Sequence, residues 1–393
     1  MQDLHCQPAL ETEGILGSLF LEWHRGEAIA LASRTELIEA FRNQSRACAE
    51  LGSPFMASLL ETAAGELERS GSIAGLLASW LGDPLADAVP LRFAAALHAL
   101  VLSGTAPELA AAYPSSGQAT DPALVWRAAL AAIEARRPDV ESFLSSPPQT
   151  NEVGRSAAML GGFLQIAHET GGKPMRLLEI GASAGLNQPW DQYRYELGEA
   201  GRWGPSDSPV TVQAEWSGPQ PSFDAAVQVA ERAACDSAPV DPEDEQARLR
   251  LRASVWADQP ARMALLDAAV ALVRRLGLRV EQGEAAAWVT ERLRERAEDR
   301  VTVLFHSIAW EYFPDDTKTR IRDAIDAAGR NADMDAPFAW LRLEPPAGNG
   351  PGGAQPELRL TLWPDGKERC LAQAHTRGPP VCWYGAGENT SHG

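Results

Sequence analysis

Residues 176–187 read RLLEIGASAGLN, and this stretch decides the fold. The run 177–180 is apolar apart from Glu179, which is typical of a buried strand. Glycines at positions 181 and 185 follow it. Glycine lets the backbone turn sharply and pass close to a ligand without a Cβ in the way. The stretch therefore predicts an α/β fold with a ligand site at the end of this strand.

The same letters fit two different chemistries. Glu179 stands two residues before the first glycine, which resembles the acidic glycine loop that holds S-adenosylmethionine in class I methyltransferases, although Ser183 replaces the middle glycine. Gly181, Ser183 and Gly185 also match the Gly-x-Ser-x-Gly nucleophile elbow of α/β-hydrolases. A dinucleotide fingerprint would need glycine at 183 and 186, where the chain has Ser183 and Leu186, so NAD is disfavoured.

The sequence before this stretch favours the cofactor loop over the elbow. An α/β-hydrolase has several strands ahead of its elbow, whereas residues 15–145 show the apolar spacing of helices. Asp365 and His375 do follow Ser183 in the hydrolase order. We expect an α/β, Rossmann-like, class I methyltransferase-type doubly wound sheet and an all-helical N-terminal domain. We expect an S-adenosylmethionine-dependent methyltransferase-like protein that acts on a small molecule. The alternatives are a serine hydrolase using Ser183 and a non-catalytic Rossmann ligand-binding module.

Proline and glycine divide the chain into regions. The pair Pro147-Pro148 ends the helical texture, so we expect a helical domain at 1–148 and the Rossmann-like domain at 149–393. Residues 198–221, rich in Gly, Pro and Ser, predict an insertion, and Asn151 is expected to cap a helix from 152 to about 168. Further strands are expected at 225–230, 278–281, 301–305, 338–343, 358–363 and 381–384.

Polar residues at the expected strand ends complete the predicted cofactor site, because ligands of such sheets bind outside the carboxyl ends of the strands. Glu284 is suited either to an adenine amino group or to capping the next helix. Asp236, with Arg232, is placed to bind ribose hydroxyls. Arg155 is expected to pair with a ligand carboxylate, or to be a solvated helix charge. The predicted cofactor-binding residues are Glu179, Gly181, Ser183, Gly185, Asn187, Glu284 and Arg155.

The predicted catalytic residues are His306, Trp310 and Glu311, which follow the strand expected at 301–305. The ordinary pKa of histidine lies near neutrality, so His306 could act as a general base beside an aromatic wall. The alternative is that His306 is a structural residue.

Composition narrows the partners. The chain has 53 acidic and 35 basic residues and a formal charge of -18, so we expect a small-molecule substrate and neither nucleic acid nor a membrane. The five cysteines are spread out without a Cys-x-x-Cys pair, which predicts reduced thiols and no metal site. The acidic start lacks the pattern of a secretory signal, and no apolar run approaches the roughly 20 residues of a membrane span. A cytoplasmic location is expected.

The chain resembles the bacterial family of the domain of unknown function two-three-three-two. The resemblance rests on TNEVGRSA at 150–157, LLEIGASAGLN at 177–187, WDQYRY at 190–195, CDSAPVD at 235–241, SVWADQ at 254–259 and FHSIAW at 305–310. It implies a class I methyltransferase-like Rossmann fold with a helical N-terminal region, and no established reaction. Pro189 departs from the apolar helix former expected there, so the next helix should start late, near Asn187, or be kinked.

Overall fold

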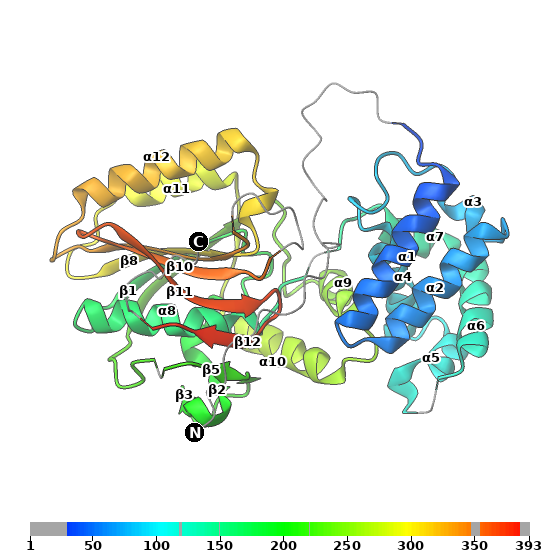
Figure 1. Ribbon diagram of the computed structural model, residues 1–393, viewed down its shortest axis with the longest axis horizontal. Helices are drawn as coiled ribbons and strands as arrows, with labels where there is room; N and C mark the ends of the chain where they lie inside the picture. The colour runs from blue at the N-terminus through cyan, green and yellow to red at the C-terminus, as the bar shows by residue number, and fades with distance from the viewer. Residues whose placement is uncertain (1–29, 118–119, 149, 220, 347–353, 386–393) are drawn as a thin grey trace.

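The computed structural model describes residues 30–117, 120–148, 150–219, 221–346 and 354–385. A helical region comes first and an α/β region follows, and the two lie side by side in Figure 1. The helical region contains α1 Arg34–Glu50, α2 Pro54–Glu68, α3 Ala74–Leu77, α4 Val89–Leu102, α5 Pro107–Ala112, α6 Pro122–Ala135 and α7 Arg137–Leu144.

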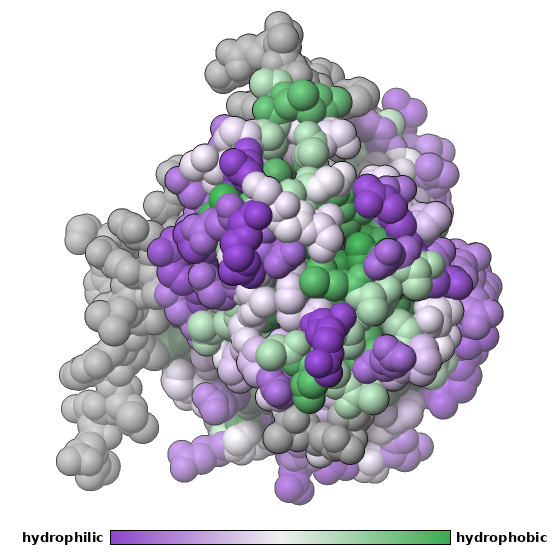
Figure 2. All heavy atoms as spheres, turned by 90° about the vertical axis from the view of Figure 1, so that its right-hand side faces the viewer, coloured by the Kyte–Doolittle hydropathy of each residue, from purple (hydrophilic) through white to green (hydrophobic). Residues whose placement is uncertain are grey.

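Helix α4 is the centre of the helical region. Its side chains are buried around the whole helix, as is typical of a helix that is apolar on all sides. Phe93 of α4 packs edge-on against Phe41 of α1, with ring centroids 5.6 Å apart. The outer face of this region, seen in Figure 2, mixes hydrophilic and hydrophobic residues. The helices therefore stabilise the region mainly through the core around α4.

A mixed sheet of nine strands forms the described part of the α/β region, in the order β5-β12-β11-β10-β9-β8-β1-β6-β7. Strands β7, β6, β1, β8 and β9 are parallel to one another, and β10, β11 and β12 continue the sheet as an antiparallel meander. Strand β5 pairs with β12 in parallel. The strands are β1 Met175–Ile180, β5 Trp216–Ser217, β6 Val229–Asp236, β7 Glu281–Gln282, β8 Val301–Ser307, β9 Phe338–Glu344, β10 Glu357–Trp363, β11 Lys367–His375 and β12 Gly378–Trp383.

Helices cover both faces of this sheet (Figure 1). Leu177 belongs to the core under α8 and α10, whereas Leu178 and Ile180 belong to the core under α11 and α12. Strand β1 is buried along its whole length for this reason, which explains its nearly continuous apolar run. The helices are α8 Arg155–Glu169, α9 Glu245–Ser254, α10 Pro260–Leu276, α11 Ala285–Arg294 and α12 Asp315–Asn331.

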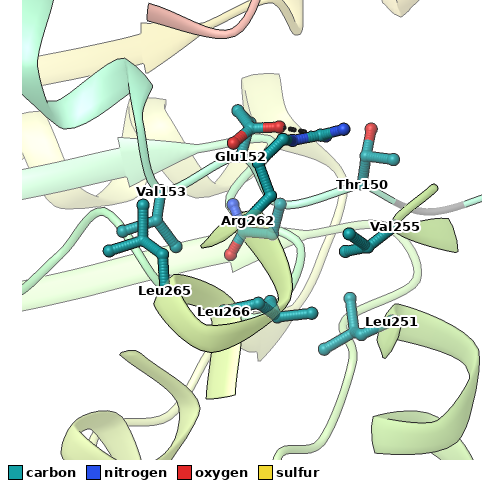
Figure 3. A pocket seen from close by; sticks show the side chains of 9 residues that line it. Thr150, Glu152, Val153, Leu251, Val255, Arg262, Leu265 and Leu266 are labelled. Atoms are coloured by element: carbon teal, nitrogen blue, oxygen red, sulfur yellow. Dashed lines mark hydrogen bonds and ion pairs between the residues drawn. The ribbon is translucent and has the colours of Figure 1, made fainter. Parts of the chain in front are cut away.

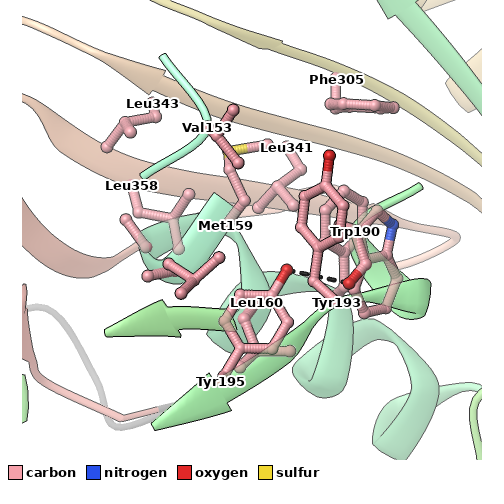
Figure 4. Packing of buried hydrophobic residues seen from close by; sticks show 14 of the residues in the cluster. Val153, Met159, Leu160, Trp190, Tyr193, Tyr195, Phe305, Leu341, Leu343 and Leu358 are labelled. Carbon is pink, nitrogen blue, oxygen red and sulfur yellow. Dashed lines mark hydrogen bonds between the residues drawn. The ribbon is translucent and has the colours of Figure 1, made fainter. Parts of the chain in front are cut away.

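A small insertion follows β1. Strands β2 Arg194–Glu196, β3 Arg202–Trp203 and β4 Thr211–Gln213 form a separate sheet in the order β3-β2-β4. Trp190 stacks on Phe163 of α8, with ring centroids 4.2 Å apart, and Figure 4 shows the aromatic side chains of the insertion close to α8. The insertion is thereby anchored in the main core.

The coarse expectation of an α/β fold behind a helical region is confirmed. The strand expected at 225–230 is wrong in its bounds, because β6 runs from Val229 to Asp236. The helix expected near Asn187 is also wrong, since turns and the 3-10 helix Trp190–Gln192 follow β1 instead. Asn151 does not cap α8, because its Oδ1 accepts a hydrogen bond from the backbone N–H of Leu186 at 2.8 Å.

None of the helices in the described part of the chain combines the length and apolar character needed to cross a membrane. Cys48, Cys235 and Cys370 are free, as expected, but Cys382 is disulfide-bonded. The expectation of reduced thiols is therefore wrong for Cys382, and Cys6 lies outside the described residues.

The segment 254–259 joins the two regions. Trp256 is buried in the core of the helical region. Asp258 accepts hydrogen bonds from Ser53 Oγ at 2.6 Å and from the backbone N–H of Phe55 at 3.1 Å. These bonds lie at the start of α2, where unpaired N–H groups favour an acidic partner. A carboxylate from the α/β region thus fixes a helix of the helical region.

Replacing Asp258 by alanine should lower the free energy of unfolding by about 1–3 kcal/mol, because it leaves buried polar groups without a partner. It should also separate the unfolding of the two regions. Asp121→Ala is the matched control, since Asp121 caps only α6 through Ala123 N. Urea denaturation followed by circular dichroism measures both. A single transition with a loss no larger than that of Asp121→Ala would contradict the role of Asp258.

Candidate functional site

A cavity of about 550 Å³ lies between the helical region and the carboxyl ends of the parallel strands. This volume is in the range of small-molecule sites. Its wall on the helical side includes Leu51, Phe55, Met56, Leu91, Ala94 and His98. Its wall on the sheet side includes Arg155, Ser183, Asp236, Ser237, Ile308 and Glu311. One side of the cavity is therefore mainly apolar and the other polar.

Strained backbone is concentrated at this cavity. Ser183, Ile308 and Ala88 line it and have φ values of 53°, 49° and 48°. The other non-glycine residues with positive φ in the described chain are Ser70 and Asp299. A branched residue such as Ile308 rarely adopts this conformation, and such strain is typical of functional sites.

Two carboxylates hold the strained turns in place. Asp236, at the end of β6, accepts a hydrogen bond from the backbone N–H of Ser183 at 2.8 Å. Glu344, at the end of β9, accepts hydrogen bonds from the backbone N–H groups of Ala309 at 3.0 Å and Trp310 at 3.2 Å. Each turn is therefore fixed by an acidic residue on the neighbouring strand.

The glycine turn has the predicted backbone conformation but no space for a ligand beside its glycines. Gly181 and Gly185 have φ values of 64° and 72°. A Cβ at Gly181 would lie 2.5 Å from the Cβ of Ala309, and one at Gly185 would lie 2.5 Å from Nε2 of Gln188. The side chains of Ala309 and Gln188 therefore occupy the space beside the glycines where a cofactor was expected.

Glu179 is only 3% exposed and is not part of the cavity wall. Its Oε2 has no hydrogen-bond partner among the described residues. Burial, and secondarily the nearby Asp236, raise the pKa of Glu179 well above its ordinary value. The raised pKa favours the uncharged carboxyl, which disfavours the predicted role of Glu179 in a cofactor loop.

The other residues predicted to bind the cofactor have different surroundings. Glu284 caps α11 by accepting hydrogen bonds from the backbone N–H groups of Ala286 at 3.1 Å and Ala287 at 2.8 Å, so the structure shows the capping alternative. Asn187 is buried, and its side-chain amide donates to the Glu152 carbonyl at 3.5 Å. Arg232 donates to the Gln188 carbonyl at 3.2 Å and pairs with Asp191. Of the predicted cofactor residues, Arg155 and Ser183 line the cavity.

His306 is completely buried, and both of its ring nitrogens are engaged. Its Nε2 accepts a hydrogen bond from Nε1 of Trp340 at 3.1 Å. Nδ1 must therefore carry the proton, and it lies 2.6 Å from Oε1 of Glu344. Trp310 stacks on the ring at a centroid distance of 5.2 Å. This arrangement supports the alternative that His306 is a structural residue. Trp310 packs against the His306 ring.

Glu311 is the predicted catalytic residue that does line the cavity, next to Tyr312. Burial raises the pKa of Glu311 above its ordinary value. A carboxyl group with a raised pKa at a cavity wall is a candidate for proton exchange with a ligand.

The residues of a serine hydrolase are not assembled. Ser183 Oγ is buried without a hydrogen-bond partner in the described chain, and Nδ1 of His375 accepts from the backbone N–H of Arg377 at 3.1 Å. Asp365 lies in the turn between β10 and β11, beside the Trp363–Phe338 pair, and therefore at the amino-terminal edge of β9. Ser183 lies at the carboxyl edge, so these groups cannot form a triad.

Arg155 is a half-buried residue at the start of α8 whose guanidinium faces the interior. Its Nε donates to the Thr376 carbonyl at 2.9 Å and its Nη1 donates to the Ser307 carbonyl at 3.1 Å. Burial lowers the pKa of Arg155. Arg155 is therefore a cation of the cavity wall, and the alternative of a solvated helix charge does not describe it.

A family model described as "Uncharacterized protein conserved in bacteria (DUF2332)" matches residues 38–383. The chain belongs to this family. The match covers the helical region together with the α/β region, so the family includes both walls of the cavity. No curated protein matches the chain. No solved structure matches it either.

The segments that carry the family resemblance converge on the cavity. Every one of them except residues 190–195 contributes to its wall. Figure 3 shows Glu152 of the first segment paired with Arg262, next to a smaller hollow of about 20 Å³ that has room for little more than water. Sequence reasoning did not identify Arg262, Tyr312 or Arg377 as wall residues, and no local pattern marks them. Among the described residues, no group of His, Cys, Asp and Glu side chains is arranged to hold a metal ion.

Glu179 predicts a specific pH dependence of stability. Its pKa is raised in the folded protein, so its contribution is fully present below the unfolded pKa of about 4.3 and is lost as pH rises toward the folded pKa. Glu179→Gln should therefore gain stability over the wild type between pH 5 and 8, by at most about 1.4 kcal/mol per pH unit. Urea denaturation at several pH values measures this difference.

Glu284→Gln is the matched control with the opposite sign. Burial alone would raise the pKa of Glu284, but the backbone hydrogen bonds from Ala287 and Ala286 outweigh it and lower that pKa. This variant should be less stable than the wild type at neutral pH, and the deficit should shrink in acid. A pH-independent difference between Glu179→Gln and the wild type would show that Glu179 is ionised in the folded protein.

Proposed function

We propose that the protein is a Rossmann-like α/β protein that binds a small organic molecule in the cavity between α4 and the carboxyl ends of β1, β6 and β8. Taken in chain order, β7, β6, β1, β8 and β9 are the third, second, first, fourth and fifth strands of the parallel part of the sheet. This is the order of a doubly wound nucleotide-binding sheet, and it supports a diverged Rossmann-like fold.

The position of the cavity carries this proposal. The strand order reverses between β1 and β8, and ligands of open α/β sheets bind outside the carboxyl ends at such a point. Ser183 follows β1, Asp236 ends β6 and Ile308 follows β8, and all line the cavity. The strained conformations of Ser183 and Ile308 add to the argument, because a protein without a ligand there has no need to retain them.

An S-adenosylmethionine-dependent methyltransferase is a second candidate function. The observation in its favour is Asp236, an acidic cavity residue at the end of the strand beside β1, where such sheets bind ribose hydroxyls. The residues predicted for the rest of this cofactor do not fit it, because Ala309 and Gln188 occupy the space beside the glycines. Glu284 is used as a helix cap and the pKa of Glu179 is raised. We therefore favour the binding of a small molecule over methyl transfer as the function of the cavity.

Native mass spectrometry of the full chain purified from its own cells tests the proposal. We expect a retained small molecule that dissociates on denaturation. Ser237→Trp, which places an indole in the cavity from an exposed loop, should abolish its retention. Ser206→Trp, on an exposed loop away from the cavity wall, should not. No retained molecule, or equal retention in Ser237→Trp, would contradict the proposal.

Thermal unfolding separates the second candidate from the first. A methyltransferase should gain thermal stability in about millimolar S-adenosylmethionine or S-adenosylhomocysteine, by mass action on the folded state. We expect no such gain, and no heat signal in calorimetry. Stabilisation that Ser237→Trp abolishes would establish the methyltransferase-like alternative.

A further inference from the structure

Two arginines on the sheet side of the cavity have no acidic partner. Arg155 donates to the carbonyls of Thr376 and Ser307. Arg377, the residue after Thr376, donates to the Leu51 carbonyl at 3.4 Å, and its guanidinium lies over the ring of Trp256 at 4.2 Å. Among the described residues, neither guanidinium has a carboxylate oxygen within 4.0 Å.

The nearby carboxylates are already engaged elsewhere. Glu152 pairs with Arg262. Glu344 accepts hydrogen bonds from two backbone N–H groups and contacts His306. Burial raises the pKa of Glu311, which favours its neutral form. Among the described residues, the two cations at this wall thus form no direct ion pair, in a chain whose formal charge is -18.

Such an arrangement is unfavourable without an anion. A partly buried cation that contacts only carbonyl oxygens and an aromatic ring has lost part of its hydration without gaining a charged partner. Burial accordingly lowers the pKa of Arg377 to about 10 and lowers the pKa of Arg155. A carboxylate or phosphate is the partner that a guanidinium binds best, through paired hydrogen bonds.

The opposite wall requires a different kind of group. Phe55 and Met56 of α2, together with Leu91, Ala94 and Ala95 of α4, present apolar surface to the cavity. Apolar surface of this kind binds alkyl or aromatic groups by excluding water. The two walls therefore select a molecule with one anionic end and one apolar end.

We propose that the ligand is a small amphipathic anion, whose carboxylate or phosphate group binds Arg155 and Arg377 and whose apolar part lies against α2 and α4. This inference rests on the proposed function, and it names the chemical class of the ligand. Arg155 is hydrogen-bonded to Thr376, the residue before Arg377, so both arginines belong to the same part of the cavity wall.

Calorimetric titration of the full chain with octanoate, octyl phosphate and octan-1-ol tests the inference. Octanoate or octyl phosphate should bind at least about tenfold more tightly than octan-1-ol, because one charge-assisted hydrogen bond contributes about that factor. The tighter of the two anions identifies the group. Binding of octan-1-ol as tight as that of both anions, or no binding of either anion, would overturn it.

Variants of the two arginines test whether these residues bind the anionic group. Arg377→Met should lose at least about tenfold in affinity for the tighter anion while octan-1-ol binding stays unchanged. Arg155→Met should do the same if it folds, and Arg377→Met decides the matter if it does not. Arg369→Met is the matched control, because Arg369 pairs with Glu169 away from the cavity wall. Unchanged anion binding in Arg377→Met would overturn the assignment.

The two proposals fail in different ways. A retained molecule that is neutral or cationic, and that Ser237→Trp excludes, would preserve the cavity as the binding site and overturn the anionic class. The absence of any ligand from the cavity would overturn the proposed function itself.

Discussion

The site depends on the docking of segment 254–259 into the helical region. Trp256 enters the core around α4, and the carboxylate of Asp258 fixes the start of α2. The carboxyl edge of the parallel strands is thereby covered by helices from the other region. The carboxyl edge of the strands thereby forms one wall of a cavity that has an apolar and a polar side. The helical region is thus part of the cavity wall, which agrees with a family match that extends over both regions.

The turns that follow β1 and β8 are stabilised in the same way, by a carboxylate on a neighbouring strand. After β1, a strained turn at Ser183 is held by the carboxylate of Asp236 on the neighbouring β6. After β8, a strained turn at Ile308 is held by the carboxylate of Glu344 on the neighbouring β9. Carboxylate oxygens make strong hydrogen bonds to backbone N–H groups, and these bonds offset the strain. The turns are therefore shaped before any ligand binds.

Part of this fold can be predicted from the sequence. The strands β1, β8 and β9 were predictable because each contains a largely apolar run, and β10 because apolar and polar residues alternate along it. Strand β6 was misplaced because its residues are mixed in polarity and only half-buried, so the pattern gives weak guidance. The helix expected after β1 is replaced by the insertion, whose aromatic residues bury themselves against α8. The packing of the insertion against α8 is a tertiary interaction, and no local sequence pattern indicates it.

The candidate site was only partly predictable for a similar reason. Ser183, Asp236 and Glu311 were singled out from their places after expected strands and Arg155 from the helix expected before the first strand, and all four line the cavity. Glu179, Glu284 and His306 have the same kind of sequence position, yet Glu179 and His306 are buried in the interior and Glu284 serves as a helix cap. Which side of a strand end faces a cavity is decided by what packs on it. Arg377 was missed because it comes from a distant turn.

A crystal structure of the full chain as purified from its own cells tests the central claim most directly. The account predicts electron density for a small molecule between Arg155 and helix α4, with the space beside Gly181 filled by Ala309. Density for a ligand beside Gly181 and Glu179, with Ala309 displaced, would contradict it.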